Sequence, residues 1–203
     1  MSEARAKNAK IWERDPDDWY VEPSWVSKRL FETVDFVGKV VDPCCGMGNI
    51  VKSALSLGIS AEGRDLRDRS QLIIDAGFTP PPNFSQQNFM DGEGYVDNVV
   101  FNPPFGLINE APYPFIEHAL DVARYSVAVM VQTMWVMGDK RSRWLETKPV
   151  RKVLLITPRP SMPPGRVILA GDKPGGGTQD YCWVIFERGY RGPRELGWLH
   201  KNG

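Results

Sequence analysis

The chain has 203 residues, of which 42% are hydrophobic and 25% are charged, and 25 Lys/Arg balance 25 Asp/Glu to a formal net charge of zero. This length and composition are typical of one soluble globular domain with a sizeable core. The mean hydropathy is −0.33, and no apolar run reaches the roughly 18 residues that a membrane span needs, so we expect a cytoplasmic protein with no membrane partner.

Strand and helix patterns alternate along the chain. In chain order, the expected strands are 38–42, 59–65, 84–87, 97–101, 126–132, 151–157 and 181–186, and the expected helices are 49–57, 67–76, 115–125 and 139–146. This alternation predicts an α/β, doubly wound Rossmann-like sheet of seven strands, mainly parallel and covered on both faces.

We expect a single domain over residues 1–203. Its irregular parts are a polar lead-in at 1–18, a long Pro/Gly-rich loop at 158–179 and a short tail at 188–203. None of these segments, and no insertion between the expected strands, is long enough for a separate target-recognition domain.

A glycine-containing turn follows the first expected strand, with the sequence Asp-Pro-Cys-Cys-Gly-Met-Gly-Asn at 42–49. Ligands of open α/β sheets bind at the carboxyl ends of the strands. Gly46 and Gly48 allow a tight turn and a close approach of the backbone to a ligand. The third glycine position of a dinucleotide fingerprint holds Val51, and no P-loop lysine follows, so a cofactor without a pyrophosphate fits better. Asp65, which ends the second strand, is placed to bind ribose hydroxyls.

The fourth expected strand ends in Asn102-Pro103-Pro104-Phe105. Two prolines fix the backbone and remove two N–H donors, which leaves carbonyls that can face a ligand. Asn102 adds an amide oxygen and Phe105 an aromatic face. This set fits a planar amine, although a rigid turn with a buried Phe gives the same pattern.

The two motifs together resemble class I S-adenosylmethionine-dependent methyltransferases that act on amino nitrogens, above all the N6-adenine DNA methyltransferases. The resemblance covers roughly residues 19–187 and implies a Rossmann-like methyltransferase fold in which the last strand is antiparallel. It implies that Asn102, Pro103, Pro104 and Phe105 form the catalytic motif. The implied cofactor-binding residues are Tyr20, Pro23, Asp42, Pro43, Cys44, Gly46, Gly48, Asp65, Asn88, Phe89 and Asn102.

The same resemblance implies a role for each part of the site. Asp42 would anchor the methionine end of the cofactor, Asp65 its ribose, and Asn88 with Phe89 its adenine. A flipped target adenine would stack on Phe105, while Asn102 and the Pro103 carbonyl accept hydrogen bonds from its amine. This sequence departs from the family at Glu22, which stands where the family often has Thr, and at Asn88, which replaces an Asp.

The expected partner is a nucleic acid, with DNA favoured. Residues 1–137 carry 12 Lys/Arg against 19 Asp/Glu (−7), and residues 138–203 carry 13 against 6 (+7). A basic part of this kind is typical of phosphate contact and equally of a solvated surface. The candidate phosphate contacts are Arg141, Arg143, Lys148, Arg159, Arg166 and Lys173.

The sequence leaves alternative functions open. Methylation of RNA adenines uses the same catalytic motif, as does methylation of the glutamine amide of release factors, and a non-catalytic cofactor-binding module is the remaining class. The chain could be a minimal orphan enzyme of the kind that phages carry, or a partner protein or oligomer could supply sequence recognition. Cys44, Cys45, Cys182, His118 and His200 form no familiar zinc spacing, so we predict no structural metal.

Overall fold

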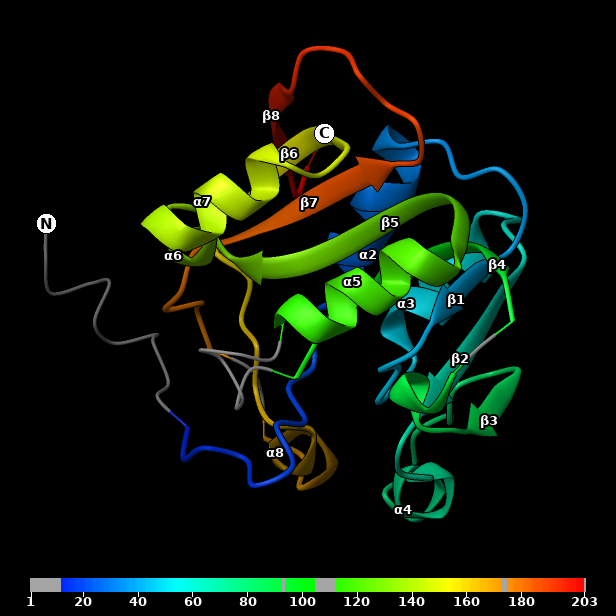
Figure 1. Ribbon diagram of the computed structural model, residues 1–203. Coiled ribbons are helices and arrows are strands. Elements are labelled where there is room, and N and C mark those ends of the chain that lie inside the picture. Colours follow the sequence, from blue (N-terminus) through cyan, green and yellow to red (C-terminus); the bar gives the residue numbers. More distant parts are fainter. Residues whose placement is uncertain (1–11, 93, 105–111, 173–174, 203) are drawn as a thin grey trace, which may run out of the picture.

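A central sheet with helices on both faces forms the body of the protein in the computed structural model, which describes residues 12–92, 94–104, 112–172 and 175–202 (Figure 1). Within these residues, no helix is long and apolar enough to cross a membrane.

The sheet contains eight strands in the described part of the chain, in the spatial order β3-β2-β1-β4-β5-β7-β6-β8. The strands are β1 (Val40–Asp42), β2 (Ala61–Asp65), β3 (Phe84–Gln86), β4 (Val96–Phe101), β5 (Ala123–Gln132), β6 (Val150–Thr157), β7 (Tyr181–Glu187) and β8 (Glu195–His200). Only β7 runs antiparallel to its neighbours, β5 and β6. The strand order reverses between β1 and β4, and an open α/β sheet binds its ligands at the carboxyl ends of the strands flanking such a reversal.

Helices cover the sheet on both sides. They are α2 (Ser24–Thr33), α3 (Asn49–Ser56), α4 (Ser70–Asp75), the 3-10 turn η1 (Phe89–Asp91), α5 (Pro112–Val122), α6 (Thr133–Val136), α7 (Asp139–Glu146) and α8 (Gly165–Leu169). Buried residues of α2 and α3 share one hydrophobic cluster with the sheet, and buried residues of α5, α6 and α7 share a second cluster on the opposite face (Figure 1). The carboxyl ends of β1 and β4 are therefore held between two packed layers.

The sequences of the strands are continuous apolar runs because both faces of the sheet are buried. Val99, Val100 and Phe101 of β4 are fully buried, and Trp183 and Phe186 of β7 are too. The predicted α/β fold with a mainly parallel sheet is confirmed, and each of the seven expected strands overlaps an observed one.

The predicted strand count was wrong, because an eighth strand lies in the expected tail at 188–203. β8 pairs in parallel with β6 at the edge of the sheet. Its apolar pattern is weak: only Leu199 is buried, Leu196 and Trp198 are largely exposed, and Gly197 interrupts the run. Gly197 packs closely on β6: a Cβ there would lie 3.0 Å from Leu154 Cδ2, so the leucine side chain would have to shift slightly. The antiparallel strand is consequently the seventh, inside the sheet, and not the last.

The expected loop at 158–179 also contains more structure than predicted. Its short helix α8 is fixed to the segment before α2: Tyr20 forms a β-bridge with Pro164, and the Gly165 N–H donates to the Trp19 carbonyl at 2.8 Å. The indole of Trp19 packs directly on Gly165, where a Cβ would lie 2.3 Å from the ring. This contact holds residues 19–21 against the rest of the fold.

We expect Gly165→Ala to lower the free energy of unfolding by about 1–3 kcal/mol, because the added methyl must displace the rigid indole of Trp19. Urea denaturation of the two proteins measures the difference. Gly94→Ala is the matched control, since a Cβ at Gly94 meets nothing within 4 Å. Equal losses in the two variants would contradict this account of the contact.

Candidate cofactor and catalytic site

The turn after β1 has the backbone that its glycines predict. Gly46 and Gly48 have φ values of +48° and +76°, in the left-handed region that favours glycine. A Cβ on Gly46 would lie 2.8 Å from Trp19 Nε1, and one on Gly48 would lie 2.6 Å from Pro81 Cβ. Asp42 is buried below the turn, where its Oδ1 accepts a hydrogen bond from the Cys44 N–H at 3.1 Å.

Asp65 joins the end of β2 to this turn. Its Oδ2 accepts a hydrogen bond from the Gly46 N–H at 2.9 Å, and its Oδ1 accepts one from Arg69 Nη1 at 2.9 Å. The Arg69 guanidinium in turn lies over the Trp19 ring, 4.7 Å from its centroid. Sequence analysis did not identify Trp19 or Arg69 as site residues. The only sequence signal was the aromatic pair Trp19-Tyr20 ahead of the glycine turn.

Asn88 and Phe89 lie beside the end of β3. The Asn88 side chain caps η1, with its Oδ1 accepting from the Met90 N–H at 3.2 Å. Phe89 is 4% exposed and packs edge-on against His118.

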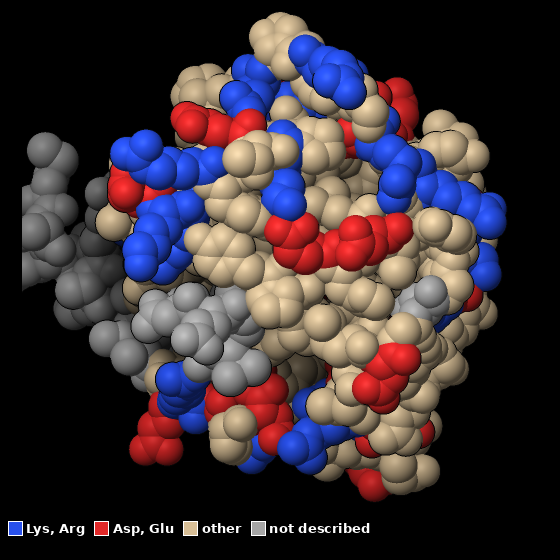
Figure 2. All heavy atoms as spheres, in the orientation of Figure 1, with Lys and Arg blue, Asp and Glu red and all other residues tan. Residues whose placement is uncertain are grey.

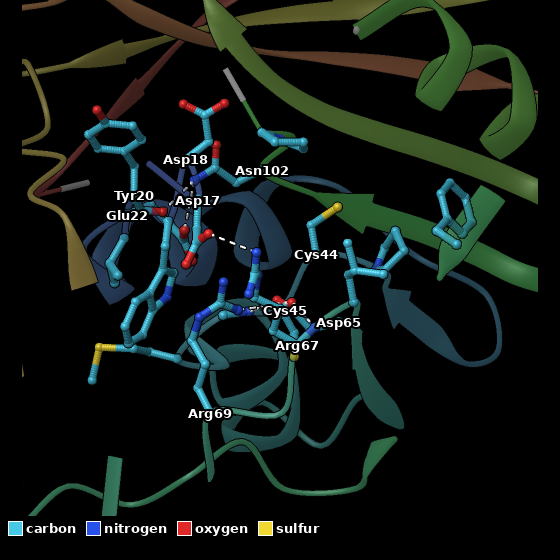
Figure 3. A pocket seen from close by; sticks show the side chains of 18 of the residues that line it. Asp17, Asp18, Tyr20, Glu22, Cys44, Cys45, Asp65, Arg67, Arg69 and Asn102 are labelled. Carbon is cyan, nitrogen blue, oxygen red and sulfur yellow. Dashed lines mark hydrogen bonds and ion pairs between the residues drawn. The ribbon is translucent and has the colours of Figure 1, made fainter. Parts of the chain in front are cut away.

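A cavity of about 150 Å³ lies between these elements, at the carboxyl ends of β1, β2 and β4. Figure 3 shows Asn102, Tyr20 and Glu22 gathered in one part of this pocket, with Asp65 and Arg69 lower in the view. The predicted site residues on its wall are Tyr20, Pro43, Cys44, Gly46, Asp65, Asn88, Phe89, Asn102 and Pro104.

The remaining predicted residues lie outside that wall. Asp42 and Gly48 shape the turn from beneath, Pro23 immediately precedes α2, and Pro103 is buried beside Asn102. Phe105 lies outside the described residues.

Asn102, at the carboxyl end of β4, is held by two acceptors. Its Nδ2 donates to the main-chain carbonyl of Tyr20 at 3.2 Å and to Glu22 Oε2 at 3.1 Å. Its Oδ1 is buried and has no hydrogen-bond partner among the described residues. An amide whose nitrogen is fixed in this way presents an acceptor, and a buried acceptor without a partner is costly unless a ligand supplies a donor.

Buried acids dominate the electrostatics of the pocket. Burial raises the pKa of Glu22 to about 7, although hydrogen bonds from its own backbone N–H and from Asn102 act in the opposite direction. Burial, and then the neighbouring carboxylates of Glu22 and Asp65, raise the pKa of Asp42 well above its usual value. The nearby cations are already paired, Arg67 with Asp17 and Arg69 with Asp65. The pocket is therefore suited to a ligand that carries positive charge.

The cysteines of the turn are poor nucleophiles. Burial and the neighbouring carboxylates Asp42 and Asp65 raise the pKa of both the Cys44 and the Cys45 thiol, and the thiolate is the reactive form. Within the described part of the chain, no cluster of three His, Cys, Asp or Glu side chains could hold a metal ion.

A second cavity, of about 360 Å³, adjoins the first. Tyr20 and Asp18 line both cavities, and the second is also lined by Gln132 and Tyr181, which face each other at the ends of β5 and β7. Asn102 lines the first cavity, and Tyr20, whose carbonyl accepts from the Asn102 amide, lines both. The sequence did not single out Gln132 or Tyr181, which the strand pairing brings together.

No protein-family profile matches the sequence, and a search of curated proteins finds no relative. The fold is similar to several solved structures. A protein from Pyrococcus horikoshii, provisionally described as an RNA methyltransferase, has a TM-score of 0.58 and 20% identity over 91% of this chain and 95% of that chain. TrmN from Thermus thermophilus has a TM-score of 0.50 and 19% identity over 81% of this chain and 48% of that chain.

A structure concerned with the conversion of a disulfide bond into a thioacetal group during echinomycin biosynthesis has a TM-score of 0.53. Its identity is 14%, over 89% of this chain and 88% of that chain. At identities this low, the likeness establishes the fold and leaves the activity to be argued from the site.

The raised pKa of Glu22 makes stability depend on pH. Between the usual value of 4.5 and the folded value of about 7, the folded chain keeps a proton that the unfolded chain has lost. The free energy of unfolding therefore falls as pH rises through this range, by roughly 3 kcal/mol in total.

We expect Glu22→Gln to remove this cost, so that the variant is more stable than the wild-type protein at pH 8 and similar to it near pH 4.5. Urea denaturation at both pH values, without added ligand, measures the effect. Glu146→Gln, at an exposed position, corrects for general changes with pH. A Glu22→Gln effect of the same size at both pH values would contradict the prediction.

Proposed function

We propose that this protein is an S-adenosylmethionine-dependent methyltransferase that acts on the exocyclic N6 amine of adenine in a nucleic acid, with DNA the favoured polymer. The observation that carries the proposal is the buried Asn102 Oδ1, an acceptor without a partner among the described residues, on a residue that lines a cavity with several acids in its wall.

The residues of the first cavity fit this cofactor. S-adenosylmethionine would supply a methyl group on a positively charged sulfonium, next to an α-ammonium group. Glu22 and Asp42 are buried acids for which the described residues supply no cationic partner, and such groups favour a cationic ligand. Trp19 Nε1, on the cavity wall, is a buried donor without a partner in the described part of the chain, and it suits a carboxylate.

The other contacts follow the resemblance noted in the sequence. Asp65 would accept hydrogen bonds from the ribose hydroxyls, since a carboxylate can accept more bonds than Gly46, Arg67 and Arg69 already donate. Phe89 offers an apolar wall for the adenine ring, and Asn88 offers an amide at its edge. Pro43, Cys44, Gly46 and Gly48 shape the turn against the methionine part.

Asn102 performs the central step by orienting the amine. Its Oδ1 would accept a hydrogen bond from the amino group, together with the Pro103 carbonyl, and direct the nitrogen lone pair towards the cofactor. Acceptors placed where positive charge develops stabilise the transition state, and positioning lowers the barrier further. The second cavity, which Tyr20, Gln132 and Tyr181 help to line, would give a planar ring a place next to the first cavity.

A nucleic-acid substrate is supported by the basic start of α7. Lys140, Arg141 and Arg143 lie there, and Figure 2 shows Lys and Arg side chains gathered at the left edge of the face it displays, where α7 begins. Four of the candidate phosphate contacts have acidic partners: Arg143 pairs with Asp139, Lys148 with Glu117, Arg159 with Asp180, and Arg166 with Asp15 and Asp17. Arg141 lies over the ring of Trp135, and Lys173 is outside the described residues.

RNA is the alternative polymer. Of the similar structures, the Pyrococcus horikoshii protein is described as an RNA methyltransferase, and another is TrmN from Thermus thermophilus. Incubating the protein and S-adenosylmethionine with DNA and with RNA, and then digesting each polymer to nucleosides, separates the two. We expect N6-methyladenine chiefly in the DNA digest. Methylation of RNA alone would change the polymer, and binding of the cofactor without methylation of either polymer would favour the non-catalytic reading.

We expect Asn102→Ala to lower the single-turnover rate by at least about 100-fold, because the lost acceptor acts mainly in the transition state. Cofactor affinity, measured by calorimetry, should change little. Asn98→Ala is the matched control: Asn98 is a buried asparagine in the first half of β4, where its side chain donates to the Val37 carbonyl and its Oδ1 also has no partner among the described residues. The Asn98 variant should lose stability and keep its rate per folded molecule. Near-normal methylation by folded Asn102→Ala protein would refute the proposed chemistry.

We also expect Arg141→Gln with Arg143→Gln to weaken binding to unrelated DNA sequences equally. The slope of log affinity against log salt should flatten by up to about two units, because two fewer phosphates are neutralised. The control is Lys28→Gln with Lys201→Gln, two exposed lysines on α2 and after β8. An unchanged slope in the arginine variant would place α7 outside the interface.

A further inference from the structure

We propose that Glu22 is a positioning residue that decides which end of the Asn102 amide faces the substrate, and that it does so most firmly when a cationic ligand fills the first cavity. This inference rests on the proposed function and adds a residue that acts through Asn102 without touching the reacting atoms.

The two ends of the Asn102 amide are similar in shape, but Nδ2 donates hydrogen bonds and Oδ1 accepts them. Nδ2 has two hydrogens, and both are used, one by the Tyr20 carbonyl and one by Glu22 Oε2. A rotation of the amide by 180° would place Oδ1 against two acceptors. The ionised form of Glu22 therefore excludes the rotated amide and leaves Oδ1 for the amine.

Glu22 is itself held in a fixed place. Its carbonyl accepts a hydrogen bond from Asn49 Nδ2 at 2.7 Å, which ties it to the start of α3. Tyr20, two residues earlier, forms the bridge with Pro164, and Pro23 follows directly before α2. Glu22 is 6% exposed, so its carboxylate cannot turn into solvent without moving these elements.

Protonation of Glu22 would weaken its control of the amide. A protonated carboxyl has an O–H that can donate to Asn102 Oδ1, so the rotated amide, with Nδ2 directed at the substrate, would keep one unfavourable contact, with the Tyr20 carbonyl, in place of two. The amide would then offer a donor to an amine that needs an acceptor. Because burial raises the pKa of Glu22 to about 7, both forms are populated near neutral pH when the cavity holds no cation.

Burial favours the protonated form of Glu22 in the ligand-free state. Asp42, from β1, is a second buried carboxylate, and its pKa is raised by burial and then by the charges of Glu22 and of Asp65, from β2. From α3 and β4 the neighbours are the neutral amides of Asn49 and Asn102. Of the arginines on the cavity wall, Arg67 pairs with Asp17 and Arg69 with Asp65.

A cationic ligand beside Glu22 and Asp42 would favour their ionised forms. Occupation of the cofactor site would in this way fix the Asn102 acceptor before the target base arrives. The same coupling requires that binding of S-adenosylmethionine releases protons near pH 7.

Measurements on the ligand-free protein test the control of the Asn102 amide by Glu22 directly. In wild-type protein labelled with ¹⁵N, the side-chain amide signals of Asn102 should titrate with a midpoint near pH 7, and in Glu22→Gln they should not. Asn98, in the first half of β4, provides a reference amide in the same spectra. An Asn102 signal that titrates identically in both proteins, or in neither, would overturn the inference, whatever the protein methylates.

Two further measurements link this control to catalysis. Calorimetry in buffers of different ionisation enthalpy should show protons released when S-adenosylmethionine binds to the wild-type protein at pH 7, and fewer released with Glu22→Gln. The single-turnover rate of Glu22→Gln should be about 10- to 100-fold lower, as for other partners that orient a site residue, and flat between pH 5 and 8 where the wild-type rate falls towards acid.

A Glu22→Gln rate that keeps the wild-type pH profile would contradict the catalytic part of the inference. A titrating Asn102 signal in a protein that methylates neither DNA nor RNA would overturn the proposed function and leave the contact between Glu22 and Asn102 standing.

Discussion

The site depends on one electrostatic constraint, the burial of two carboxylates where the segment before α2 meets the end of β1. Asp42 accepts the N–H of Cys44 and so shapes the glycine turn, whereas Glu22 accepts the amide of Asn102 and so orients the residue at the end of β4. The turn then presents the Gly46 N–H to Asp65, which fixes the end of β2. Three strands are thus joined at their carboxyl ends through acids, of which the buried Glu22 and Asp42 cost stability when ionised.

Such a cost persists only where the surroundings cannot relax. The sheet beneath the site is buried on both faces. The segment that carries Glu22 is held by the contacts of Trp19 with Gly46 and Gly165, which leave no room for a side chain on either glycine. The indole of Trp19 packs on Gly165 on one side and lies close to Gly46 on the other, and Arg69 stacks on its face. The stability supplied by the core therefore keeps Glu22 and Asp42 in place, and a cationic ligand would balance their charge, as expected for a binding site.

Much of this arrangement could be predicted from the sequence because it depends on local patterns. Buried apolar runs identified β1, β4 and β5, and the left-handed turn at Gly46 and Gly48 followed from the glycines themselves. The edge strand β8 could not be predicted, since an edge strand needs few buried residues. The contact between Glu22 and Asn102 joins positions 80 residues apart, and the sequence showed only that Glu replaces a Thr there. Its meaning became clear once the strand order placed both residues at the same edge.

The fold does not choose the substrate, because similar sheets occur in a protein described as an RNA methyltransferase and in a structure from echinomycin biosynthesis. The choice lies in the direction of a few polar atoms at the switch point. Asn102 Oδ1 is buried, fixed and without a partner among the described residues, so it selects a ligand with a hydrogen to donate. Glu22 holds the amide in this orientation and excludes the rotated amide, which would present a donor. An amine is such a ligand, because it has a hydrogen that it can donate to Asn102 Oδ1. Under the proposed function, the identity of the reacting atom depends more on the hydrogen-bond partners of Asn102 than on the sheet that carries it.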